Sequence, residues 1–199
     1  MSLLFETISI RDGLAEHLPW HQDRMEASIQ ALYGKRPDFS LAEIIRVPAE
    51  ACQGQFRCRI DYDTVISRID FQPYLLKEIN TLKMIDDNEI DYSYKYNNRD
   101  RIDELFGNRG SADDILIVKN GFITDSSTAN IIFNDGRRWL TPSMPLLEGT
   151  CRARLLDLGI IHEARIKSSD LPGFKEAKLI NAMRNPEYSA TIPVGNIYY

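Results

Sequence analysis

Three short stretches of the chain carry side chains that could do chemistry. Lys95 lies among tyrosines in DYSYKYNNR, Asp125 lies in the strand-like segment ITDSSTANIIF, and Gly149 precedes Thr150 and Cys151 in LLEGTCRARLLDLGI. A lysine whose pKa is depressed by burial can attack an aldehyde as a free amine. A buried acid can hold a ring nitrogen protonated. The unpaired N–H groups of a first helical turn can bind a phosphate.

Each stretch also has an ordinary structural interpretation. A lysine commonly lies at the surface with its stem along apolar groups, an aspartate commonly caps a turn, and a Gly-Thr pair commonly caps a helix. Together, however, the three features supply an amine for an aldehyde, an acid for a ring nitrogen and a cup for a phosphate. Those are the requirements of pyridoxal 5'-phosphate (PLP), which the residues favour as cofactor while the structural alternatives stay open.

Composition limits the kind of protein that carries these residues. The 199 residues are 43% hydrophobic and 27% charged, enough to bury a core, and the net charge of −5 gives no basic surface for nucleic acid. Cys52, Cys58 and Cys151 are odd in number and lack metal-ligand spacing, so we expect reduced thiols, no metal site and a cytoplasmic location. No long apolar run predicts a signal peptide or a membrane span.

The N-terminal part reads as α+β. Residues 3–13 predict a strand that ends in an Asp12-Gly13 turn, and residues 20–34 have helical spacing up to Gly34. A second helix is expected over residues 40–51, followed by alternating strands over residues 55–76. The charged passage from Pro73 to Ser93 has no clean period, so we expect it to connect two lobes, with a boundary near residue 75.

The C-terminal part contains two hairpin signals. Asn120-Gly121 and Asp135-Gly136 each separate two apolar segments, within residues 113–125 and 129–142. Short helices are expected over residues 99–107 and from Gly149 to Gly159. The acid and hydroxyls of residues 125–128 then form a polar turn, after which Asn130 resumes the strand.

Several motifs together resemble one known family. In order and at compatible spacings, YKYNNR, NGFITDSSTANIIF, LTPSMPLLEGTCR and LINAM resemble the class IV aminotransferases, fold type IV PLP enzymes that include branched-chain and D-amino acid aminotransferases and 4-amino-4-deoxychorismate lyase. His21 and Arg24 fall on the family's H-x-x-R helix. The resemblance implies a two-lobed fold, with lobes 1–75 and 76–199, PLP in the cleft between them, and a homodimer. Because the chain is short for the family, we expect a truncated N-terminal lobe.

The resemblance also implies roles for individual residues. Lys95 would carry PLP as a Schiff base and move the proton at the substrate Cα, and Asp125, where the family usually has glutamate, would face the pyridine nitrogen. Arg24 would grip the phosphate as a bidentate donor. The remaining cofactor-binding positions are the two hydroxyls and the helix start, namely Ser127, Thr128, Gly149, Thr150 and Cys151.

The reaction is narrowed by residues near Lys95. The pattern Lys95-x-x-Asn98-Arg99 resembles the lyase, as do Thr7 and Asn181, which together with Arg99 are the implied substrate-binding residues. This favours pyruvate elimination to give 4-aminobenzoate, with transamination of branched-chain, D- or related amino acids as the alternative, and a non-catalytic PLP-binding protein as a remote one. One of Arg57 and Arg59, which alternate on a strand, could bind a substrate carboxylate, or both could face solvent.

Overall fold

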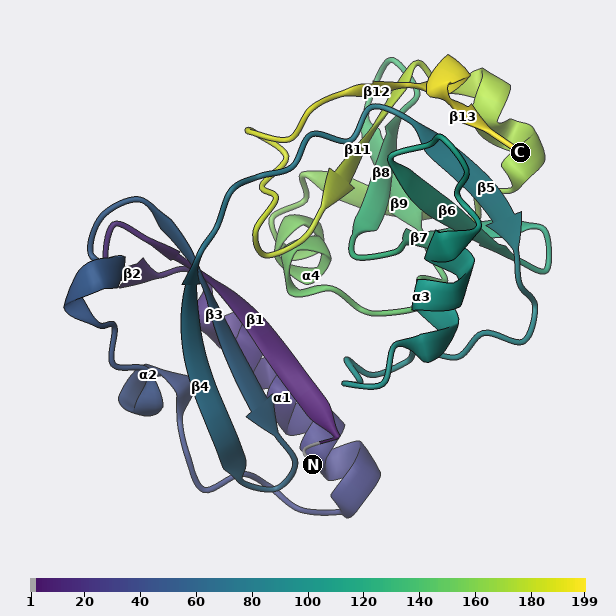
Figure 1. Ribbon diagram of the computed structural model, residues 1–199. Coiled ribbons are helices and arrows are strands. Elements are labelled where there is room, and N and C mark those ends of the chain that lie inside the picture. The colour runs from purple at the N-terminus through teal and green to yellow at the C-terminus, as the bar shows by residue number, and fades with distance from the viewer. Residues whose placement is uncertain (1–2) are drawn as a thin grey trace. The chain divides into compact units, whose positions relative to one another are not determined.

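The chain folds into two compact units in the computed structural model, which describes residues 3–199 (Figure 1). Unit 1 extends to Leu76 and also contains Tyr94–Asn98, whereas unit 2 contains Lys77–Ser93 and Arg99–Tyr199. The chain first passes from unit 1 to unit 2 between Leu76 and Lys77, next to the boundary expected near residue 75. The expectation that everything beyond it belongs to the C-terminal lobe is wrong for Tyr94–Asn98, and therefore for Lys95.

Unit 1 is a four-stranded antiparallel sheet with one long helix. Its strands are in the order β2-β1-β3-β4. The elements are β1 (Leu4–Arg11), β2 (Leu14–Ala15), α1 (Leu18–Tyr33), α2 (Leu41–Ile44), the 3-10 helix η1 (Ala49–Ala51), β3 (Gln55–Tyr62) and β4 (Ile66–Pro73). Leu4, Ile8 and Ile10 of β1 are fully buried in one core with Met25 and Ile29 of α1, because the period of two places them on the same face of the sheet.

The N-terminal elements follow the sequence signals with one exception. Asp12 and Gly13 both have positive φ and turn β1 into β2, and Gly34 ends α1 in the left-handed conformation. The expected helix over residues 40–51 is wrong, because only α2 and η1 form there. Pro48 lies between them, and a proline disfavours helical geometry at the preceding residue and has no N–H for the helical ladder.

The segment Tyr94–Asn98 joins unit 1 by pairing with β1. Phe5 N donates to the Lys95 carbonyl at 3.0 Å, and Asn97 N donates to the Leu3 carbonyl at 2.8 Å. On this edge of β1 the strand β2 covers only Ile10 and Arg11. The N-terminal half of the edge is therefore available to the later segment, which explains why Lys95 belongs to unit 1.

Unit 2 is built on a nine-stranded sheet. The path is β10-β9-β8-β7-β6-β5-β13, and β11 pairs with β8 and β12. The elements are β5 (Leu82–Asp86), α3 (Asp100–Gly107), β6 (Asp114–Lys119), β7 (Phe122–Ser126), β8 (Asn130–Asn134), β9 (Trp139–Pro142), α4 (Thr150–Asp157), β10 (Ile161–Ala164), η2 (Ser168–Gly173), β11 (Glu176–Ile180), β12 (Ile192–Pro193), η3 (Val194–Asn196) and β13 (Ile197–Tyr198).

Both predicted hairpins and both short helices of this unit are confirmed. Asn120 and Gly121 have φ of 52° and 78° and join β6 to β7, the geometry of a tight hairpin turn. Asp135 and Gly136 lie in the connection from β8 to β9. The passage after Pro73 is not only a connection, however, because it contains β5, which pairs in parallel with β6.

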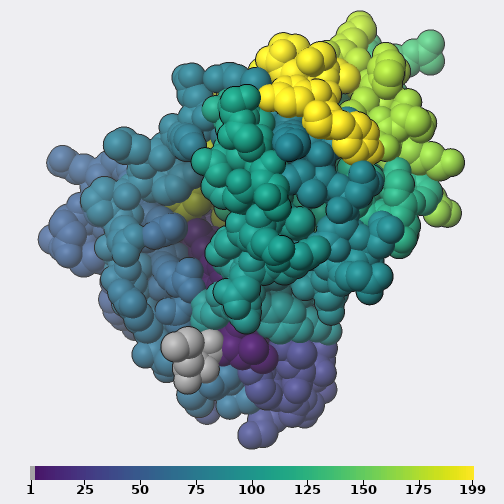
Figure 2. Space-filling view, turned by 45° about the vertical axis from the view of Figure 1, so that its right-hand side comes forward, coloured from purple at the N-terminus to yellow at the C-terminus, as the bar shows by residue number. Residues whose placement is uncertain are grey.

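The surface of unit 2 includes its C-terminal tyrosines. Tyr198 and Tyr199 are 40% and 62% exposed, and Figure 2 shows the C-terminal segment, in yellow, at the surface. Within residues 3–199, no helix has the length and apolar character needed to cross a membrane.

Candidate active site

A buried ionic cluster lies between β1 and α1 in unit 1. Glu6 is on the α1-facing side of β1 and is fully buried. His21 Nδ1 donates to Glu6 Oε2 at 2.7 Å, and Arg24 donates to both carboxylate oxygens, from Nε at 2.9 Å and Nη2 at 2.5 Å. Because His21 and Arg24 are three residues apart, they lie on one face of α1 and reach the same acid.

The charges of this cluster are fixed by its pairing. Complete burial alone would raise the pKa of Glu6, but the charge of Arg24 and the hydrogen bonds from both partners outweigh it and lower the pKa to about 2. Burial lowers the pKa of His21, helped by the positive charges of Arg24 and Lys95, despite the opposing effect of Glu6. The cluster at neutral pH is therefore an ionised acid, a neutral imidazole and a guanidinium.

This arrangement changes the expected role of Arg24. Its Nε and Nη2 edge, which is suited to bidentate binding of a carboxylate or phosphate, is directed at Glu6. A phosphate would therefore have to bind to the other edge of the guanidinium. Binding of a phosphate by the rest of the Arg24 guanidinium stays a prediction.

Lys95 lies at the edge of the same sheet, beside an aromatic ring. Its side chain is half-buried, and its Nζ is 4.8 Å from the ring centroid of Phe5, within cation–π distance. The Cζ atom of Arg59 is 4.0 Å from the same centroid. Lys95, the predicted catalytic lysine, and Arg59, one of the two candidate arginines of β3, therefore both contact the Phe5 ring.

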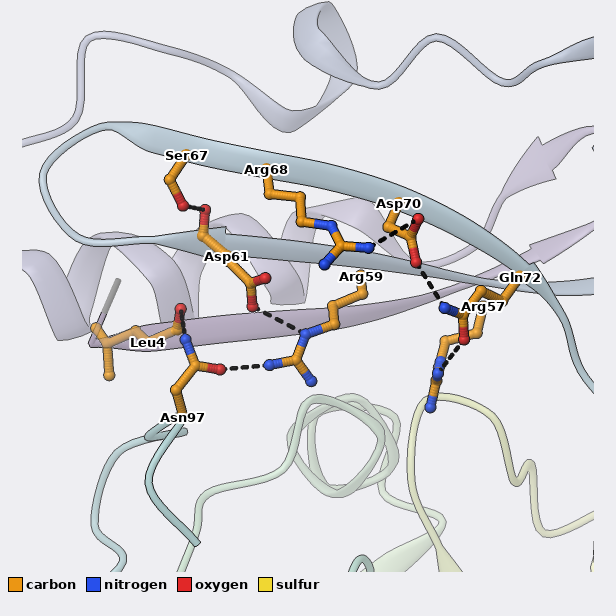
Figure 3. Close-up of polar contacts among 9 residues, drawn as sticks. All are labelled: Leu4, Arg57, Arg59, Asp61, Ser67, Arg68, Asp70, Gln72 and Asn97. Atoms are coloured by element: carbon orange, nitrogen blue, oxygen red, sulfur yellow. Dashed lines mark hydrogen bonds and ion pairs between the residues drawn. The ribbon is translucent and has the colours of Figure 1, made fainter. Parts of the chain in front are cut away.

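The face of the sheet that carries Phe5 is lined by charged side chains (Figure 3). Arg59 donates from Nε to Asp61 at 2.8 Å and from Nη2 to the side-chain oxygen of Asn97. Arg57, two residues away on β3, donates to the side chain of Gln72 on β4. Arg59 is therefore the arginine that points toward the Lys95 segment. Thr7 lies directly across from Arg59 in the β1–β3 register.

Asp125 is the centre of a second buried cluster, in unit 2. Asn130 Nδ2 donates to Asp125 Oδ1 at 2.8 Å and also to the Leu147 carbonyl at 2.8 Å, while Leu147 N donates to Asp125 Oδ2 at 2.9 Å. A Cβ placed on Gly149 would lie 2.0 Å from Asn130 Oδ1. Gly149 thus makes room for the amide that holds Asp125, a role that its interpretation as part of a phosphate cup did not include.

Asp125 lacks a close counter-charge. Full burial raises its pKa to about 6, although the Leu147 N–H, the Asn130 amide and the charge of Arg152 all act to lower it. Arg152 itself pairs with Glu163 at 2.5 Å and donates to the Pro142 carbonyl. Among residues 3–199, no cationic side chain forms an ion pair with Asp125, which is unusual for a buried acid.

The polar turn after Asp125 is held in place by two predicted substrate-binding residues. Arg99 Nη2 donates to the Ser127 carbonyl at 2.7 Å, and Asn181 Nδ2 donates to the Thr128 carbonyl at 3.1 Å. The Ser127 hydroxyl is directed at Asp114, whereas Thr128 is exposed. Arg99 and Asn181 therefore position the turn in this structure, and their contact with a substrate stays a prediction.

The start of α4 provides the remaining predicted positions. Thr150 and Cys151 form its first turn, both are buried, and Gly149 precedes them as a cap without a side chain. N–H groups at a helix start suit a phosphate. In the described part of the chain, residues 3–199, no group of three or more His, Cys, Asp or Glu side chains could hold a metal ion.

Sequence reasoning missed three residues that organise these clusters. Glu6 had no expected role, yet it pairs with His21 and Arg24 of the H-x-x-R helix. Asn130 was expected only to resume a strand, and Asn97 was not singled out. A carboxylate two residues before Ile8 on a buried face is the one signal that could have identified Glu6, since buried acids are paired.

The chain belongs to the class IV aminotransferases, because the model of that family, described as amino-transferase class IV, matches residues 3–185. Members of this family use PLP. The mixed helix-and-strand fold expected from the resemblance is confirmed by the match to solved fold IV structures.

Three relatives show how closely the chain follows the family. A Haemophilus influenzae protein of uncharacterised function is 41% identical over 182 residues, 90% of this chain and 97% of that protein. A crystal structure from Haemophilus somnus, provisionally named 4-amino-4-deoxychorismate lyase, is 37% identical with a TM-score of 0.88, over 93% of this chain and 98% of that chain. A Schizosaccharomyces pombe protein, provisionally named aminodeoxychorismate lyase, is 29% identical over 92% of this chain and 87% of that protein.

Proposed function

We propose that the chain is a PLP-dependent enzyme in which Lys95 forms the covalent bond to the cofactor and Asp125 holds the ring nitrogen protonated. The observation that supports this most strongly is Asp125, a fully buried acid without an ion-pair partner in the described residues 3–199. Buried charges are normally paired. A protonated pyridine nitrogen supplies the positive charge that this carboxylate lacks.

Each unit, taken by itself, carries groups that suit such a cofactor. Gly149 keeps the Asn130 amide against Asp125, and the α4 start offers N–H groups for a phosphate. Bound PLP supplies an electron sink that stabilises a carbanion at the substrate Cα. Lys95 Nζ would take the proton from that carbon and deliver it to the departing pyruvate in elimination or to the cofactor's aldehyde carbon in transamination, while the Asp125 carboxylate would keep a proton on the ring nitrogen.

Within this family we favour elimination of pyruvate from 4-amino-4-deoxychorismate, which leaves 4-aminobenzoate. Support comes from the provisional names of the Haemophilus somnus and Schizosaccharomyces pombe relatives and from the pattern Lys95-x-x-Asn98-Arg99. The alternative is transamination of a branched-chain, D- or related amino acid, which the family name supports. The two reactions share the proton transfer at Lys95 and differ in the bond that breaks afterwards.

Pyruvate release in the absence of any keto acid distinguishes the two reactions. A lyase regenerates its cofactor in every cycle, so it should release many equivalents of pyruvate and keep its visible absorbance. A transaminase supplied with an amino acid alone stops after it has released one equivalent of keto acid, because its cofactor is then in the amine form. Added 2-oxoglutarate restores its visible absorbance. The lyase proposal fails if the protein shows this second behaviour and leaves 4-amino-4-deoxychorismate unchanged. Cofactor binding without either reaction would instead indicate a non-catalytic PLP-binding protein.

A further inference from the structure

The face of the unit 1 sheet that carries Phe5 also places a second cation close to Lys95. Arg59 Cζ and Lys95 Nζ lie 4.0 Å and 4.8 Å from one ring centroid. The two positive groups are therefore no more than about 9 Å apart, the sum of the two distances. A small molecule with its amine near Lys95 can reach Arg59 with a group only a few bonds away.

Arg59 is held in a fixed orientation by neutral and acidic partners. Asp61 binds its Nε, and Asn97 binds its Nη2 while also donating to the Leu4 carbonyl at 3.3 Å (Figure 3). Nη1 forms no hydrogen bond to any residue in the range 3–199. A guanidinium fixed on one edge, with N–H groups left over on the other, is preorganised for a further anionic acceptor.

Arg57 differs from Arg59 although both project from the same face of β3. Its guanidinium is bound by the neutral side chain of Gln72, and its cross-strand neighbour on β1 is Ser9. Within residues 3–199, Arg57 forms no cation–π contact with Phe5 and no hydrogen bond to the Tyr94–Asn98 segment, unlike Arg59. Arg57 is therefore a matched control on the same strand and face.

Thr7 adds a hydroxyl beside Arg59. The two residues are directly opposite in the antiparallel register of β1 and β3, so their Cβ atoms are close neighbours. The Thr7 side chain is half-buried and makes no hydrogen bond within the part of the chain that the structure describes. A carboxylate at Arg59 would find this hydroxyl as a second donor.

We infer that Arg59, assisted by Thr7, binds a carboxylate of the amino substrate and thereby places the substrate's reacting carbon at Lys95. This inference rests on the proposed function, whose candidate substrates all carry a carboxylate, and it names the residue that binds that group. It also assigns the selectivity for carboxylated amines to Arg59 and not to Arg57.

Paired ligands that differ only in the carboxylate test this assignment. The PLP-loaded wild-type protein, Arg59→Ala and Arg57→Ala are titrated with 4-aminobenzoate and with aniline, with the cofactor's visible absorbance as readout. The wild-type protein and Arg57→Ala should bind 4-aminobenzoate more tightly than aniline. Arg59→Ala should bind 4-aminobenzoate about tenfold to 100-fold more weakly, the effect of losing a charge-assisted hydrogen bond, with its affinity for aniline unchanged.

Further measurements separate this inference from protein stability and from the proposed function. Arg59→Lys keeps the charge without the fork and should give an intermediate affinity, which keeps the test valid if Arg59→Ala folds poorly. If Arg59→Ala keeps the wild-type preference for 4-aminobenzoate, or the wild-type protein shows none, the inference is overturned while cofactor binding stands. A wild-type protein that never acquires the visible absorbance overturns the proposed function, and the inference with it.

Discussion

Replacing Gly149 by alanine should disrupt the cluster that holds Asp125. The added Cβ would lie 2.0 Å from Asn130 Oδ1 and 3.1 Å from its Cγ. Because φ at Gly149 is −72°, the alanine backbone itself is not strained, and any penalty must come from this contact. The Asn130 amide must therefore move away from Asp125 and from the Leu147 carbonyl, both of which it binds at 2.8 Å.

The size of the effect follows from the two hydrogen bonds. Leaving a buried polar group without its partner costs about 1–3 kcal/mol, so loss of both bonds should lower the free energy of unfolding by about 2–5 kcal/mol. Gly107→Ala is the matched control, because a Cβ there meets nothing within 4 Å and alanine favours a helix. That variant should be as stable as the wild-type protein or slightly more stable.

Urea unfolding of a double-mutant cycle identifies the cause. In the Asn130→Ala background the Gly149→Ala penalty should largely vanish, since the clashing amide is gone. If the two substitutions add independently, Asn130 is not what Gly149 accommodates, and the reasoning about the Asp125 cluster is refuted.

Four further results are expected. Glu6→Gln should lower the free energy of unfolding in urea at pH 7 by about 3 kcal/mol. The pKa of Glu6 is lowered from 4.5 to about 2, so its ionisation stabilises the fold above pH 4.5, and this stability is lost as the pH falls toward 2. Equal stability of the two proteins at pH 7 would contradict the pairing with Arg24. The raised pKa of Asp125, about 6, acts in the opposite sense. As the pH rises from 4 to 6, the cofactor-free protein should lose about 2 kcal/mol of unfolding free energy relative to Asp125→Asn, and a constant difference between the two proteins would contradict this. Arg99→Ala and Asn181→Ala, which loosen the turn after Asp125, should weaken PLP binding in spectroscopic titration, whereas a rise in KM alone would restore the substrate-binding role. The PLP-loaded protein should sediment as a homodimer, and a monomer of 22.9 kDa at micromolar concentration would exclude one.

Local sequence signals were sufficient where a structure depends on local chemistry. The Asn120-Gly121 turn, the Gly34 end of α1 and the α4 start are set by backbone preferences of a few residues. The turn after Asp125 was also predictable, because an acid followed by hydroxyls between two apolar segments suits a polar turn.

Features that depend on distant residues could not be predicted in this way. Lys95 belongs to unit 1 because β2 leaves half of one β1 edge unpaired, and nothing near Lys95 in the sequence states that. The same holds for Glu6, whose partners lie 15 and 18 residues away on α1, and for Gly149, whose closest neighbour is Asn130. Motifs identified which residues matter, but the partners of each residue required the tertiary structure.

Chemical trapping tests the assignment of Lys95 most directly. The protein is incubated with PLP, reduced with borohydride to fix the covalent bond, and digested, and the modified peptide is identified by mass spectrometry. The predicted result is one cofactor per chain, attached to Lys95, with neither labelling nor visible absorbance in Lys95→Ala. A label on another lysine, or equal labelling of Lys95→Ala, would contradict the proposed role of Lys95.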